Sequence, residues 1–147
     1  GNLWTEQVPT EAHLEYMTYP RTFAISETMW SPKSKKEWSN FVGRVEDHFG
    51  RFDQAGINYA PSIYDPMISV KKNGNGLAIE LSTEAQNLDI YYTVDNSIPN
   101  QYHTRYEQPI MFPQGADMLR LITYRNNKPI GRLISLKTED LEKRIKK

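Results

Sequence analysis

A tryptophan and a glutamate lie two residues apart near the start of this sequence, as Trp4 and Glu6 in the stretch NLWTE. In an extended or turning segment, this spacing puts a flat apolar ring and a hydrogen-bond acceptor on roughly the same side. A sugar fits such a pair, because its C–H face packs on an aromatic ring while its hydroxyls donate to a carboxylate. The structural alternative is a buried tryptophan at a helix entrance with a solvated glutamate. The short stretch alone favours that alternative.

The composition excludes several classes of function. The 147 residues are 38% hydrophobic and 24% charged, which is typical of a folded chain with one domain or two small ones. Lys and Arg together number 18, as do Asp and Glu, so no overall field attracts nucleic acid or an anionic membrane. No apolar run approaches the roughly 20 residues that a spanning helix needs. We therefore expect no nucleic-acid partner and no membrane span.

The sequence also lacks the residue patterns that metal binding and nucleophilic catalysis require. Cysteine is absent, which excludes disulfides, cysteine nucleophiles and thiolate metal sites. The histidines His13, His48 and His103 have no ligand spacing, and neither a catalytic serine motif nor a phosphate-binding loop occurs. We expect no metal site and no cofactor.

Helical periodicity dominates the first third of the chain. Thr10 is placed to cap a first helix, and Pro20 interrupts the pattern because proline cannot donate an amide to the preceding turn. These signals predict helices at about 11–18 and 20–30, with Pro20 opening the second.

The longest helix is predicted over 35–55. Ser34 and Glu37 have the spacing of a capping box, and Gly56 is placed to end the helix in a left-handed turn. Its apolar stripe consists of Trp38, Phe41, Val42, Val45, Phe49 and Phe52. We interpret this stripe as core rather than as a ligand platform.

The other carboxylates and their partners have structural interpretations. Arg21 and Glu27 are expected to form a structural ion pair or a solvated face. Asp65, Asp89 and Asp95 are interpreted as turn formers.

The period changes to two in the second half of the chain. Residues 59–66 are rich in proline and tyrosine and are interpreted as a linker. Alternating strands then follow over 67–137, with a hairpin turn at 73–76, and they predict an antiparallel sandwich of the immunoglobulin or fibronectin kind. Residues 138–147 are charged, and we expect a short helix or a frayed tail.

Three strands and one turn can be predicted more closely within this region. A strand is expected at 110–112, between two prolines, and two more are expected near 117–124 and 130–137. Asn96 is placed in a turn, where asparagine tolerates positive φ.

Tyrosines are frequent among these strands. Tyr91, Tyr92, Tyr102 and Tyr106 would suit a carbohydrate-binding surface if they were exposed, since aromatic rings stack on sugars. The alternative, which we favour, is that they line the core and edge of the sheets.

Several stretches resemble the β-N-acetylhexosaminidases of glycoside hydrolase family twenty. Those that resemble the end of the catalytic barrel are NLWTE at 2–6, YPR at 19–21, Glu27, WSP at 30–32, Trp38 and Phe41. The segment IYYTVDNSIP at 90–99 resembles a signature of the small β-domain that follows the barrel in many bacterial members. Asn96 stands where glycine is usual in that signature.

The resemblance implies an α+β chain. Residues 1–58 would be a helical remnant of the end of a (β/α)8 TIM barrel, and 67–137 the following β-domain. The position that matches Trp4 packs on the terminal sugar in the family, and the position that matches Glu6 accepts hydrogen bonds from the sugar's 4- and 6-hydroxyls. The implied reaction is retaining, substrate-assisted hydrolysis of terminal non-reducing N-acetyl-D-hexosamine residues.

The family's two catalytic carboxylates form an Asp-Glu dipeptide, and this chain contains none. We therefore expect that pair upstream of the given residues, and no activity from these residues alone. The resemblance also implies a bacterial parent that is periplasmic, secreted or on the cell surface. We expect a homodimer through the uncovered face of helix 35–55. The alternative function is a non-catalytic carbohydrate-binding or structural β-sandwich module.

Overall fold

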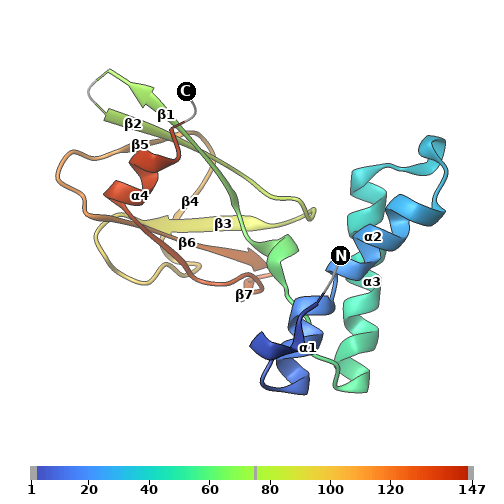
Figure 1. Cartoon of the computed structure of the whole chain (residues 1–147). Coiled ribbons are helices and arrows are strands. Elements are labelled where there is room, and N and C mark those ends of the chain that lie inside the picture. The colour runs from blue at the N-terminus through green and yellow to red at the C-terminus, as the bar shows by residue number, and fades with distance from the viewer. Residues whose placement is uncertain (1–2, 75, 146–147) are drawn as a thin grey trace. The chain divides into compact units, whose positions relative to one another are not determined.

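The computed structural model describes residues 3–74 and 76–145. The chain divides into two compact units, Gly1–Ala60 and Pro61–Lys147 (Figure 1). The first unit is helical and the second contains antiparallel sheets, so the chain belongs to the α+β class. Each unit is described here by itself.

The N-terminal unit contains three α-helices and two short 3-10 turns among its described residues. In chain order these are η1 (Thr5–Gln7), α1 (Glu11–Thr18), α2 (Arg21–Trp30), η2 (Lys33–Lys35) and α3 (Trp38–Ala55). Thr10 caps α1, because its side chain accepts a hydrogen bond from the His13 amide at 3.2 Å. Pro20 occupies the cap position of α2, so this helix begins one residue later than the sequence predicts.

The start of α3 differs from the predicted capping box. Residues 33–35 form η2, and Glu37 is itself the N-cap in an extended conformation. Its carboxylate accepts hydrogen bonds from the Ser39 amide at 3.0 Å and the Asn40 amide at 2.7 Å. One carboxylate thus satisfies two free amides of the first turn, so Ser34 has no capping role and the helix begins at Trp38. Gly56 ends α3 with a φ of 69°, as predicted.

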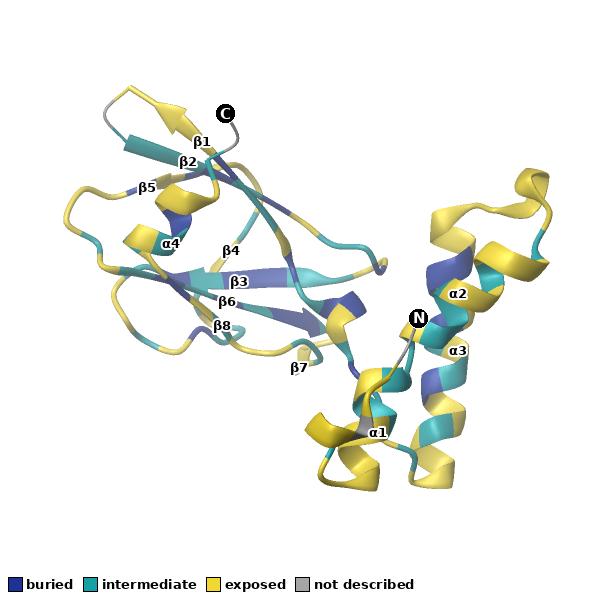
Figure 2. Cartoon of the chain, in the orientation of Figure 1, coloured by how far each residue is buried: buried dark blue, intermediate teal, exposed yellow. Residues whose placement is uncertain are grey.

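The apolar stripe of α3 forms the core of this unit, which confirms its interpretation as core. Four stripe residues are buried, namely Phe41, Val42, Val45 and Phe49 (Figure 2). The ring of Phe49 stacks on Tyr59 with 4.0 Å between centroids, and Phe52 lies 4.7 Å from Tyr19. Trp38 is the exception, since it is 55% exposed.

The C-terminal unit contains two antiparallel sheets among its described residues. The strands are β1 (Met67–Asn73), β2 (Gly76–Ser82), β3 (Asp89–Thr93), β4 (Thr104–Arg105), β5 (Ile110–Phe112), β6 (Met118–Arg125), β7 (Lys128–Pro129) and β8 (Ile134–Lys137). One sheet has the order β1-β2-β5. The other has the order β4-β3-β6-β7, with β8 also paired to β6.

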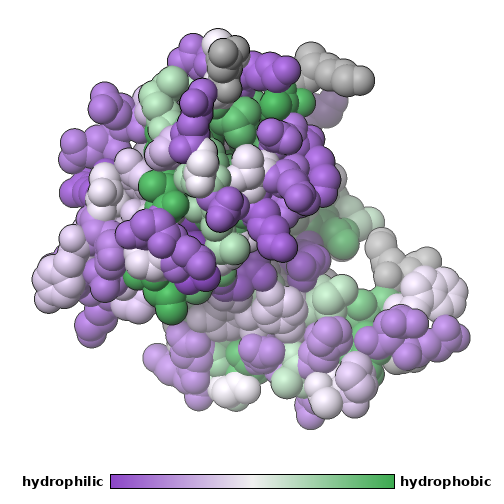
Figure 3. Space-filling view, turned by 90° about the vertical axis from the view of Figure 1, so that its left-hand side faces the viewer, coloured by the Kyte–Doolittle hydropathy of each residue, from purple (hydrophilic) through white to green (hydrophobic). Residues whose placement is uncertain are grey.

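A single hydrophobic core draws on both sheets. The smaller sheet contributes Val70, Ile79, Leu81, Ile110 and Phe112, and the larger sheet contributes Ile90, Leu119, Leu121 and Leu136. Leu141 completes this core from α4 (Thr138–Lys143) and is 0% exposed. Of the two forms expected for residues 138–147, the structure therefore has the short helix. Figure 3 shows a mainly hydrophilic face of the unit with separate hydrophobic patches.

Strand 110–112 and the positive φ of Asn96, at 67°, are confirmed. The predicted strand at 130–137 begins only at Ile134, because Lys128 and Pro129 pair back onto β6 across a tight turn. That turn contains Asn126 and Asn127, both at positive φ. The hairpin turn predicted at 73–76 includes residue 75, which lies outside the described residues.

The segment predicted as a linker is ordered: residues 59 and 60 belong to the N-terminal unit, and residues 61–66 are bound into the C-terminal unit. Residues Ser62–Tyr64 form a 3-10 turn, η3, and Tyr64 is buried. The hydroxyl of Thr123 donates to the Tyr64 carbonyl at 2.6 Å, and Arg132 pairs with the Asp65 carboxylate. The prolines of this segment therefore shape an ordered turn rather than a free connection.

Candidate functional site

Trp4 and Glu6 lie at the surface of the N-terminal unit. Trp4 is 71% exposed, directly before η1, and Glu6 is exposed within it. Neither side chain makes a ring contact, hydrogen bond or ion pair with another described residue. The interpretation of a buried tryptophan, which the short stretch favoured, is therefore wrong. Both groups are accessible to a ligand.

Arg21 and Glu27 have separate structural roles. The Arg21 guanidinium donates to the carbonyls of Tyr16 at 2.9 Å and Met17 at 3.1 Å, where it satisfies the end of α1. Glu27 accepts a hydrogen bond from Arg44 of α3 at 2.7 Å, and this bond holds the pKa of the Glu27 carboxyl below its usual value. Glu27 thus has a structural ion pair, but its partner is Arg44 rather than Arg21.

Hydrogen bonds also attach the end of the unit to α1. The Asn58 amide donates to the Glu15 carboxylate at 2.8 Å, and its side chain donates to the Ala12 carbonyl at 2.7 Å. These contacts fix α1, which begins after four residues that follow the stretch from Trp4 to Glu6. The stretch that contains Trp4 and Glu6 is therefore followed by a helix, α1, that hydrogen bonds hold in place.

The tyrosines divide by exposure. Tyr91 is buried, and Tyr92 and Tyr106 are half-buried, as the core and edge interpretation predicts. The Tyr106 hydroxyl accepts a hydrogen bond from the Leu81 amide at 3.0 Å, so its polar end is used structurally. Tyr102 is 87% exposed and is the exception. These tyrosines therefore do not form a shared stacking surface.

Among residues 3–74 and 76–145, no three His, Asp or Glu side chains gather closely enough to hold a metal ion. Within the same ranges, no helix has both the length and the apolar character needed to span a bilayer.

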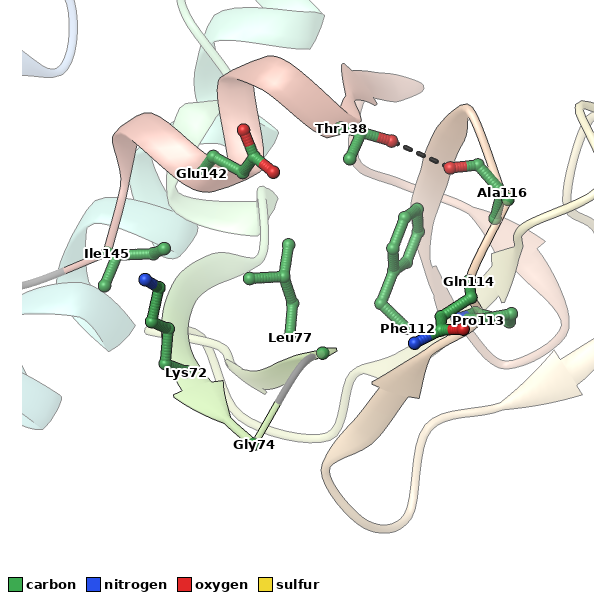
Figure 4. Close-up of a pocket in the computed structure, with 12 residues that line it drawn as sticks. Lys72, Gly74, Leu77, Phe112, Pro113, Gln114, Ala116, Thr138, Glu142 and Ile145 are labelled. Atoms are coloured by element: carbon green, nitrogen blue, oxygen red, sulfur yellow. Dashed lines mark hydrogen bonds between the residues drawn. The ribbon is translucent and has the colours of Figure 1, made fainter.

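The sequence analysis missed a hollow of about 680 Å³ in the C-terminal unit (Figure 4). Leu77 and Phe112 line it from the sheet, Lys72 and Glu142 lie at its rim, and Gln114 belongs to the loop after β5. The sequence held one signal for it. Lys72 is two residues beyond the inward-facing Val70, so a charged residue occupies a core-facing position of the strand.

Comparison with known families finds one match in each of the two units. Residues 1–33 match the catalytic domain of glycosyl hydrolase family 20, and residues 79–137 match the Fn3 associated family. The first match includes Trp4, Glu6 and the whole of α1 and α2. The two matches support a fragment of a family 20 glycoside hydrolase.

The curated relatives carry the corresponding name. A beta-hexosaminidase of Porphyromonas gingivalis is 29% identical over 131 residues, covering 84% of this chain and 16% of the relative. A beta-hexosaminidase of Akkermansia muciniphila is 44% identical over 46 residues, covering 31% of this chain and 9% of the relative. A beta-N-acetylhexosaminidase of Cellulomonas fimi is 32% identical over 60 residues, covering 41% of this chain and 12% of the relative. The chain spans less than a fifth of the length of these relatives.

Proposed function

We propose that this chain is the C-terminal part of a β-N-acetylhexosaminidase that removes terminal non-reducing N-acetyl-D-hexosamine residues from glycans. The observation that carries the proposal is the match of residues 1–33 to the family 20 catalytic domain, which includes an exposed Trp4 and Glu6. The relatives named beta-hexosaminidase support the same activity.

The proposed role of this chain is to form one wall of the subsite for the terminal sugar. The Trp4 ring packs against the C–H face of that sugar, which removes apolar surface from water. The Glu6 carboxylate accepts hydrogen bonds from the 4- and 6-hydroxyls, and bonds to a charged acceptor are stronger than neutral ones. Neither side chain has a competing partner among the described residues.

The proposed chemistry is retaining and substrate-assisted. The oxygen of the 2-acetamido group attacks the anomeric carbon, an aspartate orients that group, and a neighbouring glutamic acid protonates the leaving oxygen. Water then opens the cyclic intermediate with the same glutamate as base, which restores the original configuration. Because the chain contains no Asp-Glu dipeptide, the proposal assigns both carboxylates to residues outside these 147.

The proposed architecture follows the two family matches. The N-terminal unit is the end of a (β/α)8 barrel, whose active site lies at the C-terminal ends of its strands. The C-terminal unit is an immunoglobulin or fibronectin-like β-sandwich, supported by two antiparallel sheets around a shared core. The parent enzyme is proposed to be periplasmic, secreted or on the cell surface.

A chromogenic N-acetylglucosaminide assay tests this proposal on two proteins in parallel. We expect turnover by a longer protein that includes the catalytic domain and none by the 147-residue chain. Turnover by the 147 residues alone would overturn the placement of the catalytic pair. A longer protein that hydrolyses only sugars without an acetamido group would overturn the substrate class.

A further inference from the structure

We propose that the hollow between α4 and the smaller sheet is a second carbohydrate site that binds an N-acetylhexosamine unit of a glycan. The inference rests on the proposed function for its choice of sugar. The site itself belongs to the C-terminal unit and is separate from Trp4 and Glu6.

The floor of the hollow is set by strand register. Lys72, Leu77 and Phe112 are successive cross-strand partners in β1, β2 and β5, so their side chains share one face of the sheet. The next row on that face is Val70, Ile79 and Ile110, which belongs to the core. The hollow therefore begins where the packed core ends, with Leu77 and Phe112 as an apolar floor.

The wall opposite the floor is α4, which is attached at both ends. At its start, the Thr138 hydroxyl donates to the Ala116 carbonyl at 2.8 Å. Beyond its end, Ile145 forms a bridge with Val70 of β1, and between them Leu141 is fully buried. These contacts hold the hollow open without a ligand, which lowers the conformational cost of binding.

Polar groups with complementary roles surround the floor. Figure 4 shows the Glu142 carboxylate directed from α4 into the space above Leu77, with Lys72 at one side of the row and Phe112 at the other. Lys72, Gln114 and Glu142 make no side-chain hydrogen bond or ion pair with any described residue. Each has hydrogen-bonding capacity to offer a ligand: Lys72 donates, Glu142 accepts and Gln114 does both.

This combination selects a neutral ligand with an apolar patch and several hydroxyl or amide groups. Lys72 and Glu142 carry opposite charges that balance each other, and a neutral ligand can use both as hydrogen-bonding partners. An N-acetylhexosamine places its acetamido methyl on Leu77 and Phe112, while its N–H and hydroxyls donate to Glu142. The volume of about 680 Å³ lies within the range of ligand pockets.

The test is an NMR titration of the 147-residue chain with N,N′-diacetylchitobiose, with cellobiose as the sugar that lacks acetamido groups. We expect saturable shifts at Leu77, Phe112 and Glu142 with the first sugar and much weaker binding of the second. Glu142→Ala and Lys72→Ala should each weaken binding about tenfold, as expected for the loss of a hydrogen bond to a charged group.

Each variant has a matched control on the same element. Lys71→Ala removes a lysine from the opposite face of β1, and Glu139→Ala removes an exposed carboxylate from α4. Both should bind like the unaltered chain.

Three results overturn the inference: no saturable shift in this unit, equal binding of cellobiose, or equal losses in the control variants. Shifts confined to Trp4 and Glu6 also overturn it, while they support the proposed subsite. Conversely, an absence of hexosaminidase activity in the longer protein overturns the proposed function. Sugar binding measured in the C-terminal unit would still stand in that case.

Discussion

At the scale of single residues, accessibility separates the side chains proposed for binding from those with structural contacts. Trp4 and Glu6 are exposed and have no partners among the described residues. Glu27 has a lowered pKa, but its carboxylate is held by Arg44 and serves the contact between two helices. A perturbed pKa therefore marks structure at this position rather than a reacting group.

Among the described glycines, Gly131 is the position at which an added methyl group should lower the stability most. An added Cβ would overlap the Thr123 hydroxyl and lie 2.9 Å from the Tyr64 carbonyl. We expect Gly131→Ala to lower the free energy of unfolding by at least about 2 kcal/mol, measured by urea denaturation. In a Thr123→Ala background the same change should cost less, because one of the two obstructing atoms is gone. Equal costs in both backgrounds would show that the crowding does not arise there.

At the scale of elements, local signals predicted the helices and strands better than their ends. The roles of Thr10, Gly56 and Asn96 depend on the preference of each residue itself and not on distant contacts. The structure confirms the Thr10 cap and the positive φ of Gly56 and Asn96. The start of α3 was predicted wrongly, because Ser34 and Glu37 satisfy the capping pattern while the backbone uses only Glu37. The hollow could not be predicted, because it depends on the register between three strands. The periodicity of a single strand gives no information about that register.

The cap of α3 should make stability depend on pH. Hydrogen bonds from Ser39 and Asn40 hold the pKa of the Glu37 carboxyl below its usual 4.5. The folded state thus favours the charged carboxylate. The contribution of this carboxylate to stability is complete above the usual pKa and is lost as the pH falls through the lower pKa of the folded state. We expect Glu37→Gln to lower the melting temperature at neutral pH. In acid, the difference in melting temperature between the variant and the unaltered chain should become smaller. A difference that stays constant down to acid pH would contradict this role.

Gly50 offers the opposite test on the same helix. It lies in the interior of α3, is exposed, and an added Cβ would meet nothing within 4 Å. Gly50→Ala should therefore raise the free energy of unfolding by about 0.5–1 kcal/mol, since alanine loses less conformational entropy in a helix. Chemical denaturation measures the change, and a loss of stability would contradict the open surroundings of this position.

At the scale of the molecule, each unit has its own core and leaves different surfaces exposed. Four residues of the α3 stripe are buried within the unit, so little of the face on which we expect a dimer is exposed. Three exposed apolar residues of this unit lie on α2, where Ile25 is 45%, Met29 74% and Trp30 86% exposed. Such a surface is typical of a site that another part of a protein covers.

Self-association of the 147-residue chain should depend on that α2 surface. We expect sedimentation to show a concentration-dependent dimer that Met29→Lys weakens. Met111→Lys alters an exposed methionine of β5 in the other unit and should leave the dimer unchanged. A monomer at every concentration, or equal effects of the two substitutions, would contradict the expectation.

The central claim is that Trp4 and Glu6 form part of the sugar subsite, and steady-state kinetics of the longer protein on a chromogenic N-acetylhexosaminide test it most directly. Trp4→Ala and Glu6→Gln should each lower kcat/KM about 10- to 100-fold, the loss expected for removing a sugar stack or a charged hydrogen bond. Trp30→Ala and Glu11→Gln, which change exposed residues of the same types, should leave it within about twofold of the unaltered enzyme. Unchanged kcat/KM in the Trp4 and Glu6 variants would contradict the account.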